Sequence, residues 1–142
     1  VQVSREKVSL LQILEQIRRY MLQTLLPSAR RVTIHVGGED VIVSADCASS
    51  VALVVNELVQ NALKYAFPSG QAGRIGIELH SGRPLCQLTV WDNGVGFQAD
   101  RPRPGGAGLE LASTIVREKL TGEWSVESGP GGTRISFDFL EP

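Results

Sequence analysis

Three segments of the chain place apolar residues three or four positions apart, which is the spacing of one face of an α-helix. The first segment covers 8–25 and ends at Pro27. The second follows Asp46, a residue type that caps helix N-termini, and it runs to Phe67, directly before a proline. The third covers 109–120. The pattern therefore predicts three amphipathic helices.

Between these segments apolar and polar residues alternate, as they do in half-buried β-strands. The strand-like segments form three consecutive pairs, each joined by a turn that contains glycine: RVTIHV with DVIVSAD, RIGIELH with CQLTVWD, and EWSVES with TRISFDF. We expect each pair to form a hairpin. The order of elements predicts one α+β domain over 1–142, a two-layer α/β sandwich with a mixed, mostly antiparallel sheet and about three helices on one face.

Composition narrows the classes of function. The chain has 142 residues, of which 42% are apolar and 20% charged, and its net charge is −1. Low net charge and few aromatic residues argue against a nucleic-acid surface, and no apolar run reaches the roughly 20 residues that span a bilayer. Cys47 and Cys86 form no CxxC pair, so we expect a reducing compartment and neither a disulfide framework nor a structural metal.

The second predicted helix carries a polar stripe beside its apolar face. Glu57, Asn61 and Lys64 are four and three residues apart and share one side, whereas a merely solvated helix puts its charges opposite the core. Beside a bound triphosphate, Asn61 offers an oxygen ligand to Mg²⁺ and Lys64 a charge for phosphate. Glu57 can orient or deprotonate a nucleophile. Each residue alone also suits a partly solvated helix surface, so the combination is what indicates a site.

A glycine-rich loop, WDNGVGF, follows the fourth predicted strand. Asp92 stands at the end of this strand, and Gly94 and Gly96 permit a tight turn and close approach of a ligand. A carboxylate in this position can accept a hydrogen bond from an exocyclic amine such as that of adenine. A simple strand-ending turn explains the same residues.

A second glycine cluster, Gly105, Gly106 and Gly108, directly precedes the third predicted helix. Main-chain N–H groups at a helix N-terminus favour phosphate. The cluster matches neither the Walker A pattern nor G-x-G-x-x-G after a first strand. An ordinary flexible loop is the alternative interpretation.

Four blocks of the sequence together resemble the GHKL superfamily, which has the Bergerat-type ATP-binding fold. NELVQNALKYAF resembles its N box, WDNGVGF its first glycine box, GGAGLELA its second, and PGGTRISFDF its closing strand segment. Within the superfamily the chain is most similar to the catalytic and ATP-binding domain of a bacterial sensor histidine kinase, because RRVTIHV and VIVSAD after an opening helix fit the start of that domain. The resemblance implies ATP and Mg²⁺ as cofactors and a role in two-component signal transduction.

The resemblance also implies roles for single residues. Asn61 would hold Mg²⁺, and Glu57, Asn61 and Lys64 would form the catalytic group. Asp92 would recognise adenine over a floor of Gly94 and Gly96. The nucleotide-binding set implied by the family is Asn61, Lys64, Tyr65, Asp92, Gly94, Gly96, Gly106, Gly108, Leu109 and Thr133.

Three members of this set have more specific expectations. Thr133 would assist adenine recognition through a water molecule. Tyr65 would border the base or ribose, although its helical position suits the core equally well. The main chain of 106–108 would contact phosphates beside Lys64, and 97–105 would form a mobile lid, short here and stiffened by Pro102 and Pro104.

A histidine kinase of this kind needs a phosphoacceptor histidine on a helix of a dimerisation domain, whereas His35 and His80 lie in predicted strands. The resemblance thus implies that the chain binds Mg-ATP and transfers the γ-phosphate to a histidine on a separate domain, with a response regulator as an indirect partner. We expect the acceptor and sensor domains to lie outside this chain. We also expect the isolated domain to be a cytoplasmic monomer without contact to nucleic acid or membrane, and the membrane anchoring of the parent protein is left open.

Two alternatives share these sequence blocks. An anti-sigma-factor serine kinase has the same boxes, but the long first helix and the basic strand segment after it argue against this class. A non-enzymatic GHKL adaptor that has lost ATP is the other alternative. The residues that argue against an adaptor are Asn61, Asp92, Gly94, Gly96 and Gly108, all of which are intact.

Overall fold

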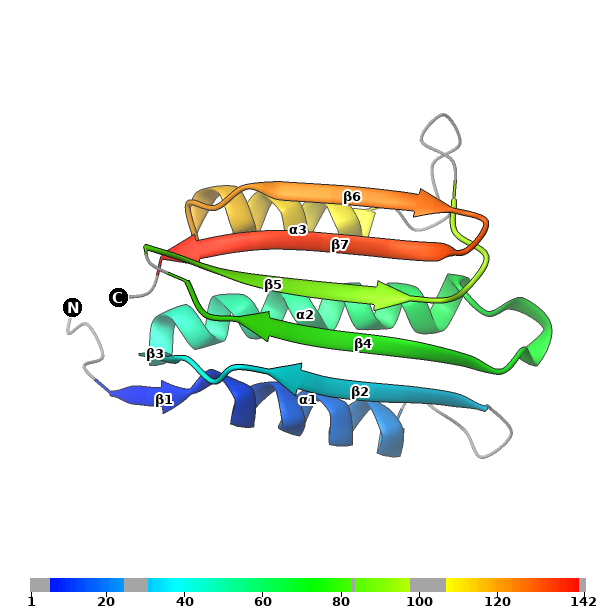
Figure 1. The fold of residues 1–142 in the computed structure, drawn as a ribbon, viewed down its shortest axis with the longest axis horizontal. Coiled ribbons are helices and arrows are strands. Elements are labelled where there is room, and N and C mark those ends of the chain that lie inside the picture. Colours follow the sequence, from blue (N-terminus) through cyan, green and yellow to red (C-terminus); the bar gives the residue numbers. More distant parts are fainter. Residues whose placement is uncertain (1–5, 25–30, 83, 98–106, 141–142) are drawn as a thin grey trace.

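The computed structural model describes residues 6–24, 31–82, 84–97 and 107–140. The elements are β1 (Lys7–Ser9), α1 (Leu10–Thr24), β2 (Val32–Gly38), β3 (Ile42–Ser44), α2 (Ala45–Tyr65), a 3-10 turn (Pro68–Gly70), β4 (Gly73–His80), β5 (Leu85–Asp92), α3 (Ala107–Glu118), β6 (Trp124–Gly129) and β7 (Gly132–Leu140). Figure 1 shows the three described helices on one face of the large sheet. The predicted α+β two-layer sandwich is therefore confirmed.

The main sheet has five strands in the order β2-β4-β5-β7-β6. β2 and β4 are parallel, and the other neighbouring strands are antiparallel. The sheet is thus mixed and mostly antiparallel, as predicted. The hairpins β4–β5 and β6–β7 are also confirmed, whereas the parallel pair needs a crossover, which α2 provides.

The hairpin predicted between RVTIHV and DVIVSAD is wrong, because β2 pairs with β4 and β3 pairs with β1. Gly38 has a φ of 109°, and a Cβ there would lie 2.0 Å from the carbonyl oxygen of Leu79, so this glycine permits close approach of β2 to β4. The chain then turns at Asp40. The Asp40 carboxylate accepts hydrogen bonds from the Ser9 hydroxyl at 2.6 Å and the Leu11 amide at 2.9 Å, which ties the turn to the start of α1.

The helix boundaries differ from the prediction by a few residues. The first helix begins at Leu10, because the residues before it form β1. Ser44, not Asp46, caps α2: the Cys47 amide donates to the Ser44 hydroxyl at 3.1 Å. Asp46 lies in the first turn instead, where its carboxylate complements the helix dipole. The helix ends at Tyr65, two residues earlier than predicted.

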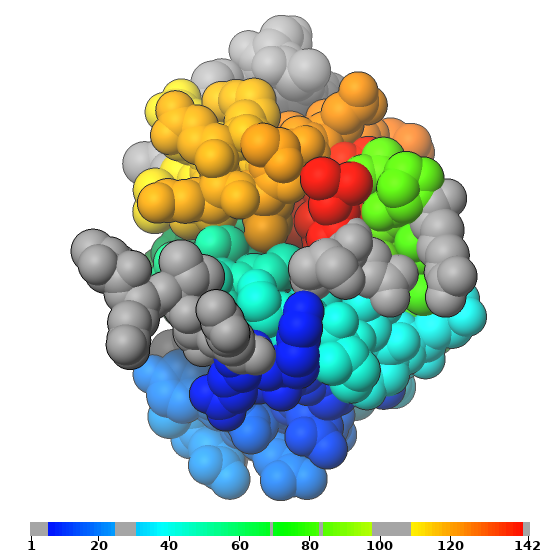
Figure 2. All heavy atoms as spheres, turned by 90° about the vertical axis from the view of Figure 1, so that its left-hand side faces the viewer, coloured from blue at the N-terminus to red at the C-terminus, as the bar shows by residue number. Residues whose placement is uncertain are grey.

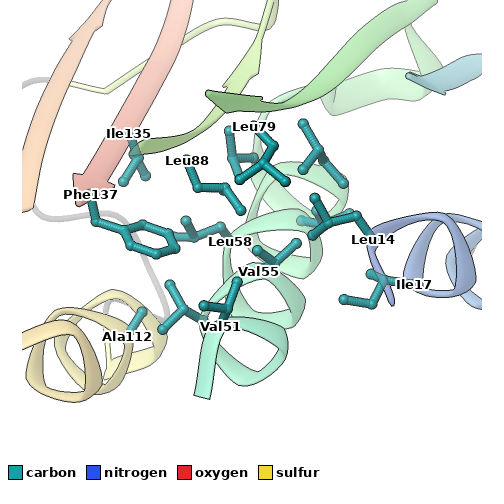
Figure 3. Close-up of a cluster of buried hydrophobic side chains, with 14 of the residues drawn as sticks. Leu14, Ile17, Val51, Val55, Leu58, Leu79, Leu88, Ala112, Ile135 and Phe137 are labelled. Atoms are coloured by element: carbon teal, nitrogen blue, oxygen red, sulfur yellow. The ribbon is translucent and has the colours of Figure 1, made fainter. Parts of the chain in front are cut away.

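The core lies between α2 and the sheet. In Figure 3, α2 contributes Val51, Val55 and Leu58, the sheet contributes Leu79, Leu88, Ile135 and Phe137, and the flanking helices contribute Leu14, Ile17 and Ala112. Figure 2, viewed from the end at which α2 begins, shows α3, α2 and α1 stacked in that order. The central position of α2 holds its polar stripe at the edge of this core, where the candidate site begins.

Candidate functional site

The three residues of the polar stripe on α2 differ in burial. Glu57 is half-buried, Asn61 is buried with 6% of its surface exposed, and Lys64 is exposed. Among the described residues the Asn61 carboxamide makes no hydrogen bond. Buried polar side chains are nearly always hydrogen-bonded, so this amide has capacity for a ligand. Tyr65, in the last turn of α2, is half-buried, and its role at a base or ribose stays a prediction.

Asp92 ends β5 and is buried. Its Oδ1 atom accepts a hydrogen bond from the Gly94 amide at 2.9 Å, which orients the carboxylate. Thr133, also buried, is the register partner of Asp92 on β7. The fold therefore brings together Asp92 and Thr133, two predicted site residues separated by 41 positions along the chain.

A third side chain joins this pair. The Ser128 hydroxyl lies 2.8 Å from the Thr133 hydroxyl and accepts a hydrogen bond from the Phe97 amide at 2.8 Å. Ser128 thus connects the closing hairpin to the loop that follows Asp92. Ser128 was not among the predicted site residues, although it stands opposite Thr133 in a hairpin that was predicted.

The two glycines of the first glycine box press this loop against its neighbours. A Cβ on Gly94 would lie 2.2 Å from the carbonyl oxygen of Ala66. Gly96 has a φ of +69°, and a Cβ there would lie 1.9 Å from the carbonyl oxygen of Gly129. The Val95 amide donates to Ala66 at 2.9 Å. The loop is therefore fixed between the end of α2 and the β6–β7 turn.

The second glycine cluster falls only partly within the described residues. Gly105, Gly106 and most of the predicted 97–105 lid, including its two prolines, lie outside them. Gly108 lies in the first turn of α3, and Leu109 beside it is half-buried against the core. The phosphate contacts expected there stay predictions.

A cavity of about 510 Å³ lies between Phe97, Leu109 and the side of β6 that carries Trp124 and Val126. Ser128 also lines it, so the cavity adjoins the Asp92–Thr133 pair. A larger cavity of about 690 Å³ lies between the start of α2 and the turn after α3, and it contains none of the predicted site residues. A further cavity of about 480 Å³ is lined by Asp92 and Thr133 themselves and shares Ser128 with the first cavity. These two cavities border the residues whose chemistry suits a nucleotide.

Within the described parts of the chain, no group of three or more His, Cys, Asp or Glu side chains could hold a metal ion. The described helices also include none that is long and apolar enough to cross a membrane. The one metal ligand that the sequence predicts, Asn61, has a buried amide, and its role as a ligand stays a prediction.

Residues 47–142, from the first turn of α2 to the C-terminus, match the family described as histidine kinase-, DNA gyrase B-, and HSP90-like ATPase. The chain belongs to this ATPase family. The resemblance to the GHKL superfamily is confirmed, and membership of an ATPase family implies that the domain binds ATP.

The relatives that the chain matches include a sensor protein and a histidine kinase. The swarming motility regulation sensor protein RssA of Serratia marcescens is 36% identical over 116 residues, which covers 71% of this chain and 24% of the relative. The blue-light-activated histidine kinase 2 of Erythrobacter litoralis is 31% identical over 112 residues, which covers 75% of this chain and 32% of the relative. The chain thus spans a third or less of each of these two relatives.

The fold has solved counterparts as well. The histidine kinase domain of an Erythrobacter litoralis blue-light activated histidine kinase superposes with a TM-score of 0.84 and 24% identity, over 99% of this chain and 69% of that structure. At this identity the likeness is one of fold. The family match thus identifies an ATPase domain, and the solved structure has the same fold.

Proposed function

We propose that this ATPase domain is the catalytic and ATP-binding domain of a sensor histidine kinase. It binds Mg-ATP and transfers the γ-phosphate to a histidine on a separate dimerisation domain. The observation that carries the proposal is the buried amide of Asn61, which has no hydrogen-bond partner among the described residues and lies on the helix whose end contacts the Asp92 loop. The sensor-kinase relatives support the class of reaction.

Asn61 fits the proposed metal. Its carboxamide oxygen is a neutral oxygen donor, and Mg²⁺ binds through few protein ligands together with substrate phosphates and water. Bound Mg²⁺ would neutralise charge that develops on the phosphates. The Asn61 amide has no hydrogen-bond partner among the described residues, so its oxygen is available to a ligand.

In the proposed nucleotide site, the Asp92 carboxylate accepts a hydrogen bond from the exocyclic amine of adenine. The Gly94 amide holds this carboxylate in place, and Thr133 lies beside it to bind a bridging water. Gly94 and Gly96 let the loop after Asp92 pack against Ala66 and Gly129, which keeps the carboxylate in position. Lys64, exposed at the end of the same helix as Asn61, supplies a mobile positive charge for the phosphates.

The proposed transfer rests mainly on positioning and charge stabilisation. A nitrogen of the acceptor imidazole forms a bond to the γ-phosphorus while the bond to the β–γ bridging oxygen breaks, and ADP leaves. Glu57 lies one turn before Asn61 and is half-buried, so its carboxylate can hold the acceptor imidazole through a hydrogen bond and take its proton. The proposal includes a dimerisation domain outside this chain that carries the acceptor histidine. It also includes a response regulator, which receives the phosphate from that histidine.

A phosphotransfer assay tests the proposal. The chain is incubated with ATP labelled at the γ-phosphate and either a dimerisation domain with an acceptor histidine or a small protein with an acceptor serine. We expect the label to appear on the histidine domain and to be lost on acid treatment, because phosphohistidine hydrolyses in acid. Acid-stable label on the serine protein would support the serine-kinase alternative, and ATP binding without transfer to either would leave a non-enzymatic role.

A further inference from the structure

We propose that Asn93 is a positioning residue for the adenine site. Its side chain completes the β4–β5 ladder in place of a main-chain carbonyl and thereby lets the chain turn from Asp92 toward α2. This inference rests on the proposed function, because it concerns the placement of the carboxylate that recognises adenine.

The hydrogen bonds at the end of the ladder show that a side-chain oxygen takes the place of a main-chain carbonyl. The last regular pair of β4 and β5 is Ile75 with Asp92. At the next position the Asn93 amide donates to the Arg74 carbonyl at 3.2 Å, as in an antiparallel pair. The return bond is different: the Arg74 amide donates to Oδ1 of the Asn93 side chain, at 2.7 Å. One further pair is therefore formed, half by the main chain and half by a side chain.

Because the side chain supplies this bond, the main-chain carbonyl of Asn93 need not point toward β4, and the chain can leave the direction of the strand. Directly afterwards the Gly94 amide turns back to Asp92 at 2.9 Å, and the Val95 amide reaches Ala66 at 2.9 Å. The loop is thus held on one side by β4, through Asn93, and on the other by α2, through Val95. Asp92 is the residue that both attachments fix.

The residue type matters for a physical reason. Asn and Asp have side chains short enough to hydrogen-bond with main-chain groups nearby and so to stand in for a turn of the backbone. Alanine has no acceptor, whereas aspartate retains an oxygen at the same place. Asn93 is exposed, so its removal leaves no cavity, and water can reach the Arg74 amide. An Asn93→Ala variant is therefore expected to fold and to lose order in the loop.

The test compares ATP with inosine triphosphate, which lacks the exocyclic amine. Calorimetry with Mg²⁺ measures the Kd of both for wild type, Asn93→Ala, Asn93→Asp and, as a control on the exposed face of β5, Gln87→Ala. We expect wild type to prefer ATP by about tenfold or more, the worth of a hydrogen bond to a charged group. Asn93→Ala should weaken ATP binding by about fivefold to tenfold, the effect of one lost hydrogen bond, and inosine triphosphate binding by less than twofold.

Asn93→Asp and Gln87→Ala should keep both the affinity for ATP and the preference over inosine triphosphate. A merely structural role would weaken both nucleotides equally and leave their ratio unchanged, which would overturn the inference. Unchanged ATP binding by Asn93→Ala would overturn it too, while leaving the proposed function intact. A wild-type chain that binds no ATP, or does not prefer ATP, would overturn the proposed adenine recognition together with the inference.

Discussion

Replacing Gly94 by alanine adds a methyl group at a position where the neighbouring atoms leave no room for it. The added Cβ would lie 2.2 Å from the carbonyl oxygen of Ala66 and 2.6 Å from its Cβ. Ala66 is fully buried, so it cannot move away cheaply. We expect the loop to move off the end of α2 instead, breaking the hydrogen bonds of Gly94 to Asp92 and of Val95 to Ala66.

The structure allows an estimate of the cost. Two lost hydrogen bonds correspond to about 2 kcal/mol of unfolding free energy, and any residual overpacking adds to this. For a chain of this size, the loss lowers the melting temperature by about 8 °C. Because the same movement displaces the Asp92 loop, the affinity for ATP should fall by about tenfold or more.

Gly37→Ala is the matched control. A Cβ on Gly37 would meet nothing within 4 Å, and its φ is not in the left-handed region. Alanine there should be neutral or stabilise by up to about 1 kcal/mol. Urea denaturation followed by tryptophan fluorescence, together with calorimetry of ATP binding, measures both variants. A Gly94→Ala protein as stable as Gly37→Ala, with wild-type affinity for ATP, would refute the reasoning.

Three further predictions concern other parts of the domain. Burial acts to raise the pKa of Asp40, but hydrogen bonds from the Ser9 hydroxyl and two main-chain amides outweigh it and hold the pKa below its ordinary value. Asp40→Ala should therefore cost about 1 kcal/mol at neutral pH, because the side chain is exposed and solvent weakens its interactions. In urea titrations this difference from wild type should shrink as the pH falls from about 4 through the lower folded pKa, and a constant difference would contradict the assignment. Ser128→Ala removes the acceptor of the Phe97 amide, so ATP affinity measured by calorimetry should fall about fivefold, and an unchanged Kd would count against Ser128. Glu57→Gln should slow phosphotransfer by about 100-fold or more in single-turnover assays but change the Kd for ATP less than twofold, and equal losses would exclude its proposed role.

Local patterns were enough to predict most of the architecture. Three helical periodicities and two hairpins were found because each depends on neighbouring residues. The polar stripe and the first glycine box pointed to a site only in combination, because Asn61 alone suits a solvated helix surface and Gly94 alone suits a strand-ending turn. The structure adds that the Asn61 amide is buried and that Gly94 permits close approach to Ala66.

The features that escaped prediction depend on contacts between distant segments. Gly37 and Gly38 resemble a hairpin turn. In the structure, however, Gly38 allows β2 to lie close to Leu79 of β4, a strand that follows α2 in the sequence. The position of Ser128 beside Thr133 needs the register of the closing hairpin. The bond from Arg74 to Asn93 needs the register of β4 against β5, which the residues themselves do not specify.

Binding of ATP by the purified chain, titrated with and without Mg²⁺ beside Asp92→Ala, tests the central claim most directly. The account predicts saturable binding that weakens when Mg²⁺ is removed and falls by about tenfold or more when the Asp92 carboxylate is lost. Absence of binding at millimolar ATP, or equal affinity of wild type and Asp92→Ala, would contradict it.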